Sequence, residues 1–94
     1  MIVLRKRPHE AVELCNIPNK LEDLQKQVGG YIETVTIAED CCIICNEEGR
    51  LKNLPFNMEL CGMEFVGTIL VVGVAGEDFC DVSPTAIDLF LRIR

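Results

Sequence analysis

The segment Thr68-Ile69-Leu70-Val71-Val72-Gly73-Val74 is the most strand-like part of the chain. Its run of aliphatic residues predicts a strand that belongs to the hydrophobic core. Gly73 interrupts the run, and a glycine inside a strand indicates a bulge or the close approach of another backbone segment. The segment therefore predicts a core strand to which the other elements must be fitted.

Two earlier segments predict a hairpin. Tyr31–Ile37 alternates as a half-exposed strand does, and the apolar run Cys41–Cys45 suits its partner strand. Ala38-Glu39-Asp40 between them predicts a turn. Since strand side chains alternate, one side of the first strand carries Tyr31, Glu33, Val35 and Ile37, and the other carries Ile32, Thr34 and Thr36.

The N-terminal third predicts another hairpin, followed by a helix. Its strands are Ile2–Arg7 and Ala11–Cys15, separated by a break at Pro8. Asn19 precedes Glu22 by three residues, a pattern typical of a capped helix start. Gly29-Gly30 ends the helix, because glycine adopts the left-handed C-terminal conformation at little cost. The apolar positions of this helix are Leu21, Leu24 and Val28.

The C-terminal half has weaker signals until its last helix. Leu51–Asn57 contains Pro55 and predicts an irregular segment, whereas Met58–Phe65 suits either a short strand or a loop. Ser83 and Pro84 are typical of a helix cap and a first helical residue, and the helix is expected to continue through Ser83–Arg94. Its apolar stripe consists of Ala86, Ile87, Phe90 and Leu91.

Together these elements predict one α+β domain over residues 1–94. We expect a mostly antiparallel sheet of four to six strands, with one helix after the first hairpin and one C-terminal helix. A chain of 94 residues with 49% apolar and 26% charged residues is ordinary for a single globular domain.

The charge balance limits the possible partners. The net charge is −6, which opposes direct binding to nucleic acid, because that binding needs cations on the protein. The longest run without a charged residue, Phe65–Gly76, is too short to span a bilayer. The first residues lack the charge order of a secretory signal. We therefore expect a cytoplasmic protein that contacts no membrane.

The six cysteines are expected to be free structural thiols. Cys42 and Cys45 match a C-x-x-C pattern, but within one strand they point to opposite faces and cannot chelate together. A zinc site would need the scattered Cys61 and Cys80, and redox chemistry would need a following helix, which is absent from the predicted elements. Buried thiols are favoured over both alternatives, and we predict no metal.

The sequence contains no pattern typical of an enzyme. His9 is the only histidine and lies in a predicted turn, without a nucleophile nearby in sequence. Glu47 and Glu48 are adjacent in a turn, where their side chains diverge. No phosphate-binding loop, nucleophile elbow or zinc-protease pattern occurs. We expect no catalytic residues and no cofactor.

The segment Asn46–Asn57 has more polar detail than a plain turn needs. It contains three asparagines, two cations and Gly49, and such turns suit neutral polar or phosphate-bearing ligands. The alternative is that the asparagines only satisfy local backbone groups.

Four segments of the chain carry a family resemblance. They are Val28-Gly29-Gly30-Tyr31-Ile32-Glu33, Cys45-Asn46-Glu47-Glu48-Gly49-Arg50-Leu51, Leu54-Pro55-Phe56-Asn57 and Gly67-Thr68-Ile69-Leu70-Val71-Val72-Gly73. In this order they resemble the DUF3846 family, over roughly residues 1–80. The family is of uncharacterised function and is encoded by phages and mobile elements. The resemblance therefore implies a bacterial host cell as the setting.

For a small phage protein without catalytic motifs, the resemblance implies action by binding. The first hypothesis is an anti-defence sponge that sequesters a nucleotide-derived immune signal, such as a cyclic ADP-ribose or a cyclic dinucleotide. Tyr31 would stack on a base, Arg50 and Lys52 would bind phosphate, and the polar edges would be bound by Asn46, Asn53 and Asn57. We expect a homo-oligomer, with an apolar edge near Thr68–Val74 as a candidate interface.

The second hypothesis is an acidic protein that inhibits a host defence enzyme. Its negatively charged face would consist of Glu33, Glu39, Asp40, Glu47 and Glu48. An accessory role in phage replication is a third possibility.

Overall fold

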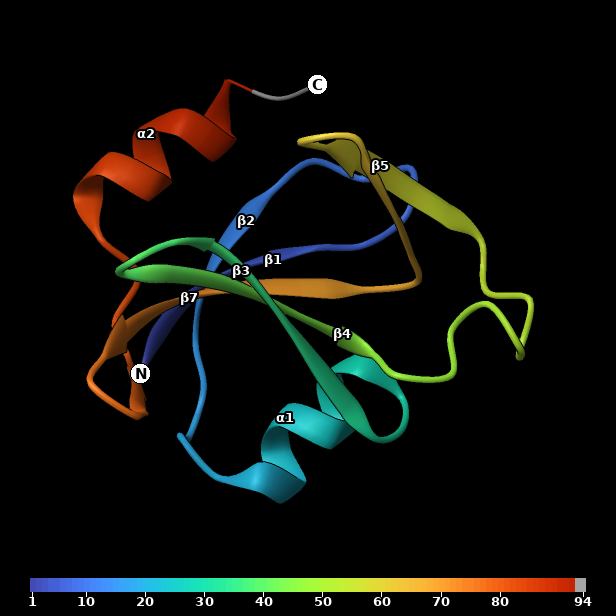
Figure 1. Cartoon of the computed structure of the whole chain (residues 1–94), viewed down its shortest axis with the longest axis horizontal. Helices are drawn as coiled ribbons and strands as arrows, with labels where there is room; N and C mark the ends of the chain where they lie inside the picture. Colours follow the sequence, from blue (N-terminus) through green and yellow to red (C-terminus); the bar gives the residue numbers. More distant parts are fainter. Residues whose placement is uncertain (93–94) are drawn as a thin grey trace.

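The computed structural model describes residues 1–92, which form an α+β fold with two antiparallel sheets (Figure 1). Six strands form the main sheet in the order β2-β1-β7-β4-β3, and β8 pairs with β7 beside the end of β1. These strands are β1 (Ile2–Lys6), β2 (Glu13–Asn16), β3 (Ile32–Ala38), β4 (Cys41–Asn46), β7 (Ile69–Ala75) and β8 (Asp78–Cys80). The predicted fold class is confirmed.

A separate two-stranded sheet follows β4. It consists of β5 (Phe56–Leu60) and β6 (Met63–Val66), so the ambiguous stretch Met58–Phe65 is most of a hairpin. Cys61 and Gly62 at its turn have φ of 53° and 77°. Positive φ at both central residues is what a type I′ turn requires, and this turn matches the twist of the strands.

The two faces of the main sheet carry separate cores. On one face, α1 (Leu21–Val28) buries Leu24 and Val28 against Ile44 and Leu70. On the other face, α2 (Pro84–Leu91) and the β5–β6 hairpin bury Phe90, Met58 and Phe65 against the sheet. Consecutive residues of β4 and β7 are therefore both buried, which explains their unbroken apolar sequences.

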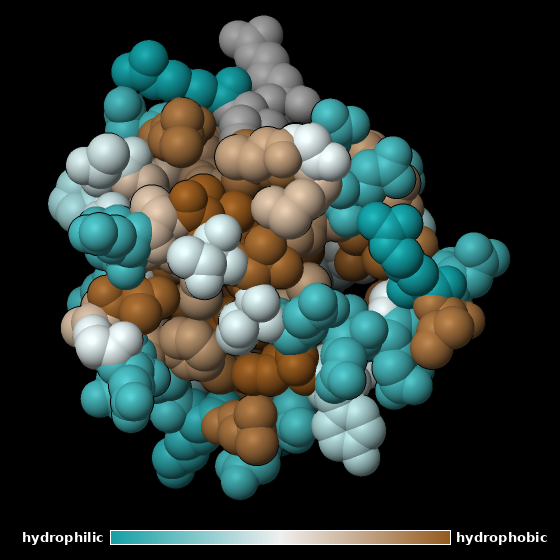
Figure 2. Space-filling model, viewed as in Figure 1, coloured by the Kyte–Doolittle hydropathy of each residue, from teal (hydrophilic) through white to brown (hydrophobic). Residues whose placement is uncertain are grey.

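The hairpin and α2 cover their face incompletely. Val35, Ile37, Leu60 and Ile87 pack against this core but are only partly buried. Figure 2 shows apolar side chains gathered in the middle of the view, with hydrophilic residues around them. The side chains of Val35 and Ile37 lie on the same side of β3, as the alternation predicts.

Strand β7 lies in the interior of the sheet, with β1 and β4 as neighbours. The expectation of an apolar edge near Thr68–Val74 is therefore wrong, because both edges of this strand are already paired; the edge strands are β2, β3 and the short β8. Gly73 does mark a close approach, since a Cβ there would lie 2.2 Å from the carbonyl oxygen of Asp81. Any side chain at this position would displace the chain that leads into α2.

The two helices begin differently. Ser83 caps α2 as predicted, because its Oγ accepts a hydrogen bond from the Ala86 amide at 3.1 Å. Asn19 does not cap α1: the N-cap residue is Lys20, and the Asn19 Nδ2 donates to the carbonyl oxygen of Phe79. Gly29 ends α1 with φ of 79°, as predicted. Neither helix in residues 1–92 is long and apolar enough to span a membrane.

Candidate functional site

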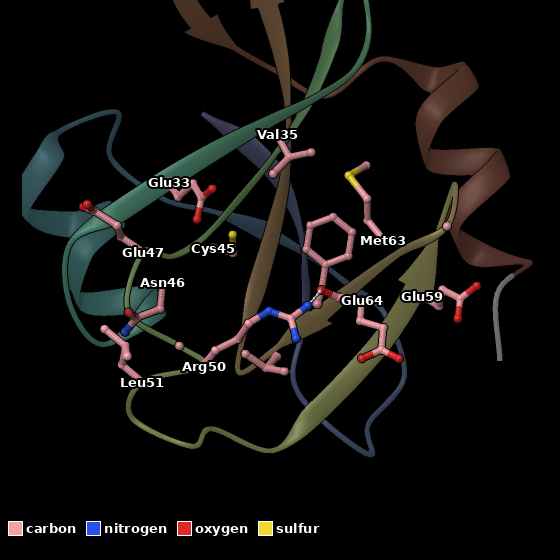
Figure 3. Close-up of a pocket in the computed structure, with 14 residues that line it drawn as sticks. Glu33, Val35, Cys45, Asn46, Glu47, Arg50, Leu51, Glu59, Met63 and Glu64 are labelled. Atoms are coloured by element: carbon pink, nitrogen blue, oxygen red, sulfur yellow. Dashed lines mark hydrogen bonds between the residues drawn. The ribbon is translucent and has the colours of Figure 1, made fainter.

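A cavity of about 600 Å³ opens between the main sheet and the β5–β6 hairpin. One wall is formed by β3 and the end of β4, the opposite wall by the hairpin, and the third by the loop after β4 (Figure 3). The lining residues are Glu33, Val35, Cys45, Asn46, Glu47, Gly49, Arg50, Leu51, Glu59, Gly62, Met63, Glu64, Phe65 and Val66.

The loop after β4 is held against the hairpin by close packing at two glycines. The loop itself is a series of turns, in which the Gly49 amide donates to Asn46 and the Leu54 amide donates to Gly49. A Cβ at Gly49 would lie 2.8 Å from Cγ2 of Val66, and one at Gly67 would lie 2.7 Å from Cδ1 of Leu54. The absence of a side chain at both positions therefore allows this close packing, and Gly49 and Val66 both line the cavity.

Arg50 places a guanidinium group in the cavity. Its Nη2 donates a hydrogen bond of 3.0 Å to the backbone carbonyl of Glu64 on β6 (Figure 3). Within residues 1–92, Arg50 forms no ion pair with a carboxylate. The guanidinium therefore has further N–H donors that an anionic group can use.

Glu33 and Cys45 form a directly opposed pair across β3 and β4, on the side that faces the cavity. Burial, together with the nearby Glu33 carboxylate, raises the pKa of the Cys45 thiol to about 11. Burial raises the pKa of Cys42, on the opposite face, to about 11 as well. Both thiols are therefore protonated at neutral pH, and Cys45 is a poor nucleophile.

The carboxylates around the cavity outnumber its one cation. Glu33, Glu47, Glu59 and Glu64 all line it, together with Arg50. In Figure 3 the carboxylates of Glu47 and Glu59 point away from the middle of the cavity. Val35, Met63 and Phe65 contribute apolar side chains to the same lining. The cavity thus combines an apolar wall with isolated charged groups.

Asn46 and Asn57 have structural hydrogen bonds. Asn46 lines the cavity, but its Nδ2 donates to the last carbonyl of α1 at Val28, and its Oδ1 accepts from the Glu48 amide. Asn57 lies outside the cavity lining and is buried. Its Nδ2 donates to the carbonyls of Lys6 and Gly67, and its Oδ1 accepts from the Lys6 ammonium at 2.8 Å.

A bulge explains the position of Asn57. The β5–β6 register shifts between Phe56 and Met58, so Asn57 is the extra residue. A bulge redirects a side chain, and here it turns the amide toward Lys6, which is only 8% exposed. The Lys6–Asn57 contact therefore links β1 to the hairpin.

The remaining predicted ligand residues do not line the cavity. Tyr31 is 65% exposed, just before β3. The Lys52 ammonium lies over Gly30, 3.1 Å from where a Cβ would stand. Asn53 is exposed with φ of 56°, a turn conformation that asparagine tolerates. Of the six predicted residues, the structure brings Asn46 and Arg50 to the cavity.

The sequence analysis missed the wall contributed by the hairpin, namely Glu59, Gly62, Met63, Glu64, Phe65 and Val66. The sequence indicates this hairpin by two short apolar segments with Cys61-Gly62 between them. A residue pair that ends in glycine is typical of two-residue hairpin turns. Val35 and Cys45 were predicted only as strand residues, and Glu33 was assigned to the acidic-face hypothesis.

All six cysteines are free thiols; Cys41, Cys42 and Cys45 are buried, whereas Cys61 is exposed. In the part of the chain that the structure describes, no three histidine, cysteine or acidic side chains are grouped to hold a metal ion. His9 has φ of 63° in the β1–β2 turn and does not line the cavity.

Comparison with known proteins identifies the family. The model of the domain of unknown function DUF3846 matches residues 1–93, so the chain belongs to this family. No curated protein matches significantly, and no solved structure does.

Proposed function

We propose that the protein binds and sequesters a small nucleotide-derived signalling molecule in the cavity, without converting it. A volume of about 600 Å³ lies within the range of small-molecule sites. In this proposal the ligand's phosphate binds the Arg50 guanidinium, and its base contacts the apolar wall at Val35 and Met63. Following the family resemblance, the protein is a phage-encoded anti-defence sponge in the cytoplasm of a bacterial host, and it acts as a homo-oligomer.

The observation that carries this proposal is that, within residues 1–92, no carboxylate pairs with the Arg50 guanidinium. Four glutamates line the same cavity, yet the guanidinium is bonded to a backbone carbonyl and to none of their carboxylates. A charged donor next to an apolar wall suits a ligand with an anionic group and a flat ring. The protonated Cys45 thiol and the distant His9 support binding over covalent chemistry.

Calorimetry with cyclic ADP-ribose and a set of cyclic dinucleotides tests the proposal. We expect one of these compounds to bind, and Arg50→Ala to weaken that binding about 10- to 100-fold, as expected for a hydrogen bond to a charged group. Arg92→Ala is the matched control, because Arg92 pairs with Asp88 on the exposed side of α2.

The fate of the ligand distinguishes a sponge from an enzyme. After the complex is heated, mass spectrometry should recover the compound unchanged. A modified compound, or no binding across the whole set, would overturn the proposal.

The second candidate, an acidic inhibitor of a host defence enzyme, is favoured by the four glutamates around the cavity. Under this alternative, a basic surface of the host enzyme would contact the glutamates around the cavity, of which Glu33 and Glu47 belong to the predicted acidic face. A combined Glu33→Gln, Glu47→Gln and Glu64→Gln variant should then lose inhibition of the purified host enzyme, whereas Arg50→Ala should retain it.

A further inference from the structure

Glu33 is a hydrogen-bond acceptor on the β3 wall of the cavity, whereas Arg50 belongs to the loop wall. It lies on β3, paired across the ladder with Cys45, and its side chain faces the cavity (Figure 3). Within residues 1–92 its carboxylate has no hydrogen bond and no ion pair, so both oxygens are free to accept. An ionised carboxylate accepts hydrogen bonds but donates none.

The polar neighbours of Glu33 leave its carboxylate free to accept hydrogen bonds. The Asn46 amide is engaged by Val28 and Glu48. The Cys45 thiol is only a weak donor. The cavity therefore presents an acceptor pair at the β3 wall and a charged donor group at the loop wall, and Val35, Met63 and Phe65 add apolar side chains to its lining.

A ligand that fits this arrangement needs two adjacent N–H donors at one end and an anionic group at the other. Guanine has such donors, N1–H and the N2 amino group, on its Watson–Crick edge. Adenine places the lone pair of N1 beside its amino group, and that lone pair would face a carboxylate oxygen. Hypoxanthine keeps N1–H but lacks the amino group, so it offers one of the two hydrogen bonds.

We propose that the cavity selects a guanine nucleotide, with the Glu33 carboxylate accepting from guanine N1–H and N2–H while Arg50 binds the phosphate. This inference rests on the proposed function and adds the identity of the base. A free carboxylate also repels the ligand's phosphate, so its place on the wall is favourable only if the base forms hydrogen bonds to it.

The test compares cyclic di-GMP, cyclic di-IMP and cyclic di-AMP by calorimetry, together with GMP, IMP and AMP. We expect affinity to decrease from guanine to hypoxanthine to adenine, with at least about tenfold between guanine and adenine. Glu33→Gln should weaken guanine binding about tenfold or more and leave adenine binding little changed. Glu39→Gln is the matched control, because it removes the same charge from an exposed side chain that does not line the cavity.

The outcomes separate the two proposals. If adenine compounds bind as tightly as guanine compounds, and Glu33→Gln strengthens both, Glu33 is only a repulsive charge and the guanine inference fails. The proposed function would survive that result, provided that Arg50→Ala still weakens binding. If no nucleotide binds the unmodified protein, both proposals fail together.

Discussion

Asn57 shows how one residue type has different meanings in sequence and in structure. In the sequence, three asparagines around a glycine turn predict polar contacts to a ligand. The alternative prediction is that their side chains form hydrogen bonds to nearby backbone groups. Asn57 instead bonds to Lys6, 51 positions away in the sequence. The β-bulge that turns its side chain toward Lys6 has no local signature here, so this partner could not be predicted from the segment alone.

We predict that Asn57→Ala destabilises the fold more than it affects the binding site. The change leaves the buried Lys6 ammonium and two backbone carbonyls without this partner, at about 1–3 kcal/mol for each group left unpaired. Urea unfolding measures the loss, and Asn53→Gly is the control because glycine tolerates the positive φ there. Equal stability of the two variants would show that the Lys6–Asn57 contact contributes nothing.

The buried thiols predict a loss of stability at high pH. The pKa of Cys42 and Cys45 is about 11 in the folded protein, against 9.0 for an ordinary thiol. Folding therefore keeps protons that the unfolded chain releases, so this stabilisation is complete below pH 9 and is lost between about pH 9 and 11. Each thiol contributes a slope on the order of 1 kcal/mol per pH unit in that window.

Unfolding under reducing conditions from pH 8 to 10.5 measures this slope. Cys45→Ala should be less stable than the unmodified protein at pH 8, but its stability should fall less steeply above pH 9. If the stability of the two proteins fell equally steeply with pH, the predicted contribution of Cys45 to the pH dependence would be contradicted.

Among the elements, strands with a single clear pattern were predicted well. The alternation of β3 and the apolar run of β4 placed their hairpin and the faces of their side chains, including Cys42 and Cys45 in opposite cores. The Ser83-Pro84 start of α2 was predicted because its cap is local. The start of α1 was not, because Asn19 bonds to β8 residue Phe79, which is distant in sequence.

The hairpin β5–β6 was missed for two local reasons. Its turn uses Cys61 where asparagine or aspartate is the usual residue, although φ of 53° is positive as the turn requires. The bulge at Asn57 breaks the alternation of β5, so Asn57 and Met58 are buried in succession. Six of the fourteen lining residues therefore come from a hairpin for which the Cys61-Gly62 pair was the only local signal.

A comparison of two glycines tests the close approach at the end of β7. Gly73→Ala would place Cβ 2.2 Å from the carbonyl oxygen of Asp81, and we expect it to cost about 3 kcal/mol or more through forced backbone shifts. A Cβ at Gly76 would contact no other atom. Gly76→Ala should therefore lose only about 1–2 kcal/mol of stability, which is the cost of the left-handed conformation at φ of 63°. Denaturant unfolding distinguishes them, and an equal loss would contradict the contact.

At the scale of the whole molecule, the net charge of −6 opposes the approach of an anionic ligand, and Arg50 acts only at short range. Salt screens the long-range repulsion, with a Debye length of about 10 Å at 0.1 M, more than it screens the contact. We therefore predict that affinity for a bound cyclic dinucleotide stays constant or rises up to about threefold between about 20 and 300 mM NaCl.

Calorimetry across this salt range provides the measurement. A basic protein partner would show the opposite trend, because salt screens its attraction to the glutamates. A fall in nucleotide affinity of tenfold or more would contradict the assignment of Arg50 as a local contact within a repulsive field.

The two sheets are separate hydrogen-bonded units, and this separation has a consequence for the range of ligands. Within residues 1–92 no strand pairing joins the hairpin to the main sheet; the two are connected by the Lys6–Asn57 contact and by the packing of Met58 and Phe65. A tilt of the hairpin would therefore leave every ladder intact and would change the width of the cavity. If the proposed binding function holds, we expect ligands of different size to be accommodated by the angle between the sheets, without a change in either sheet.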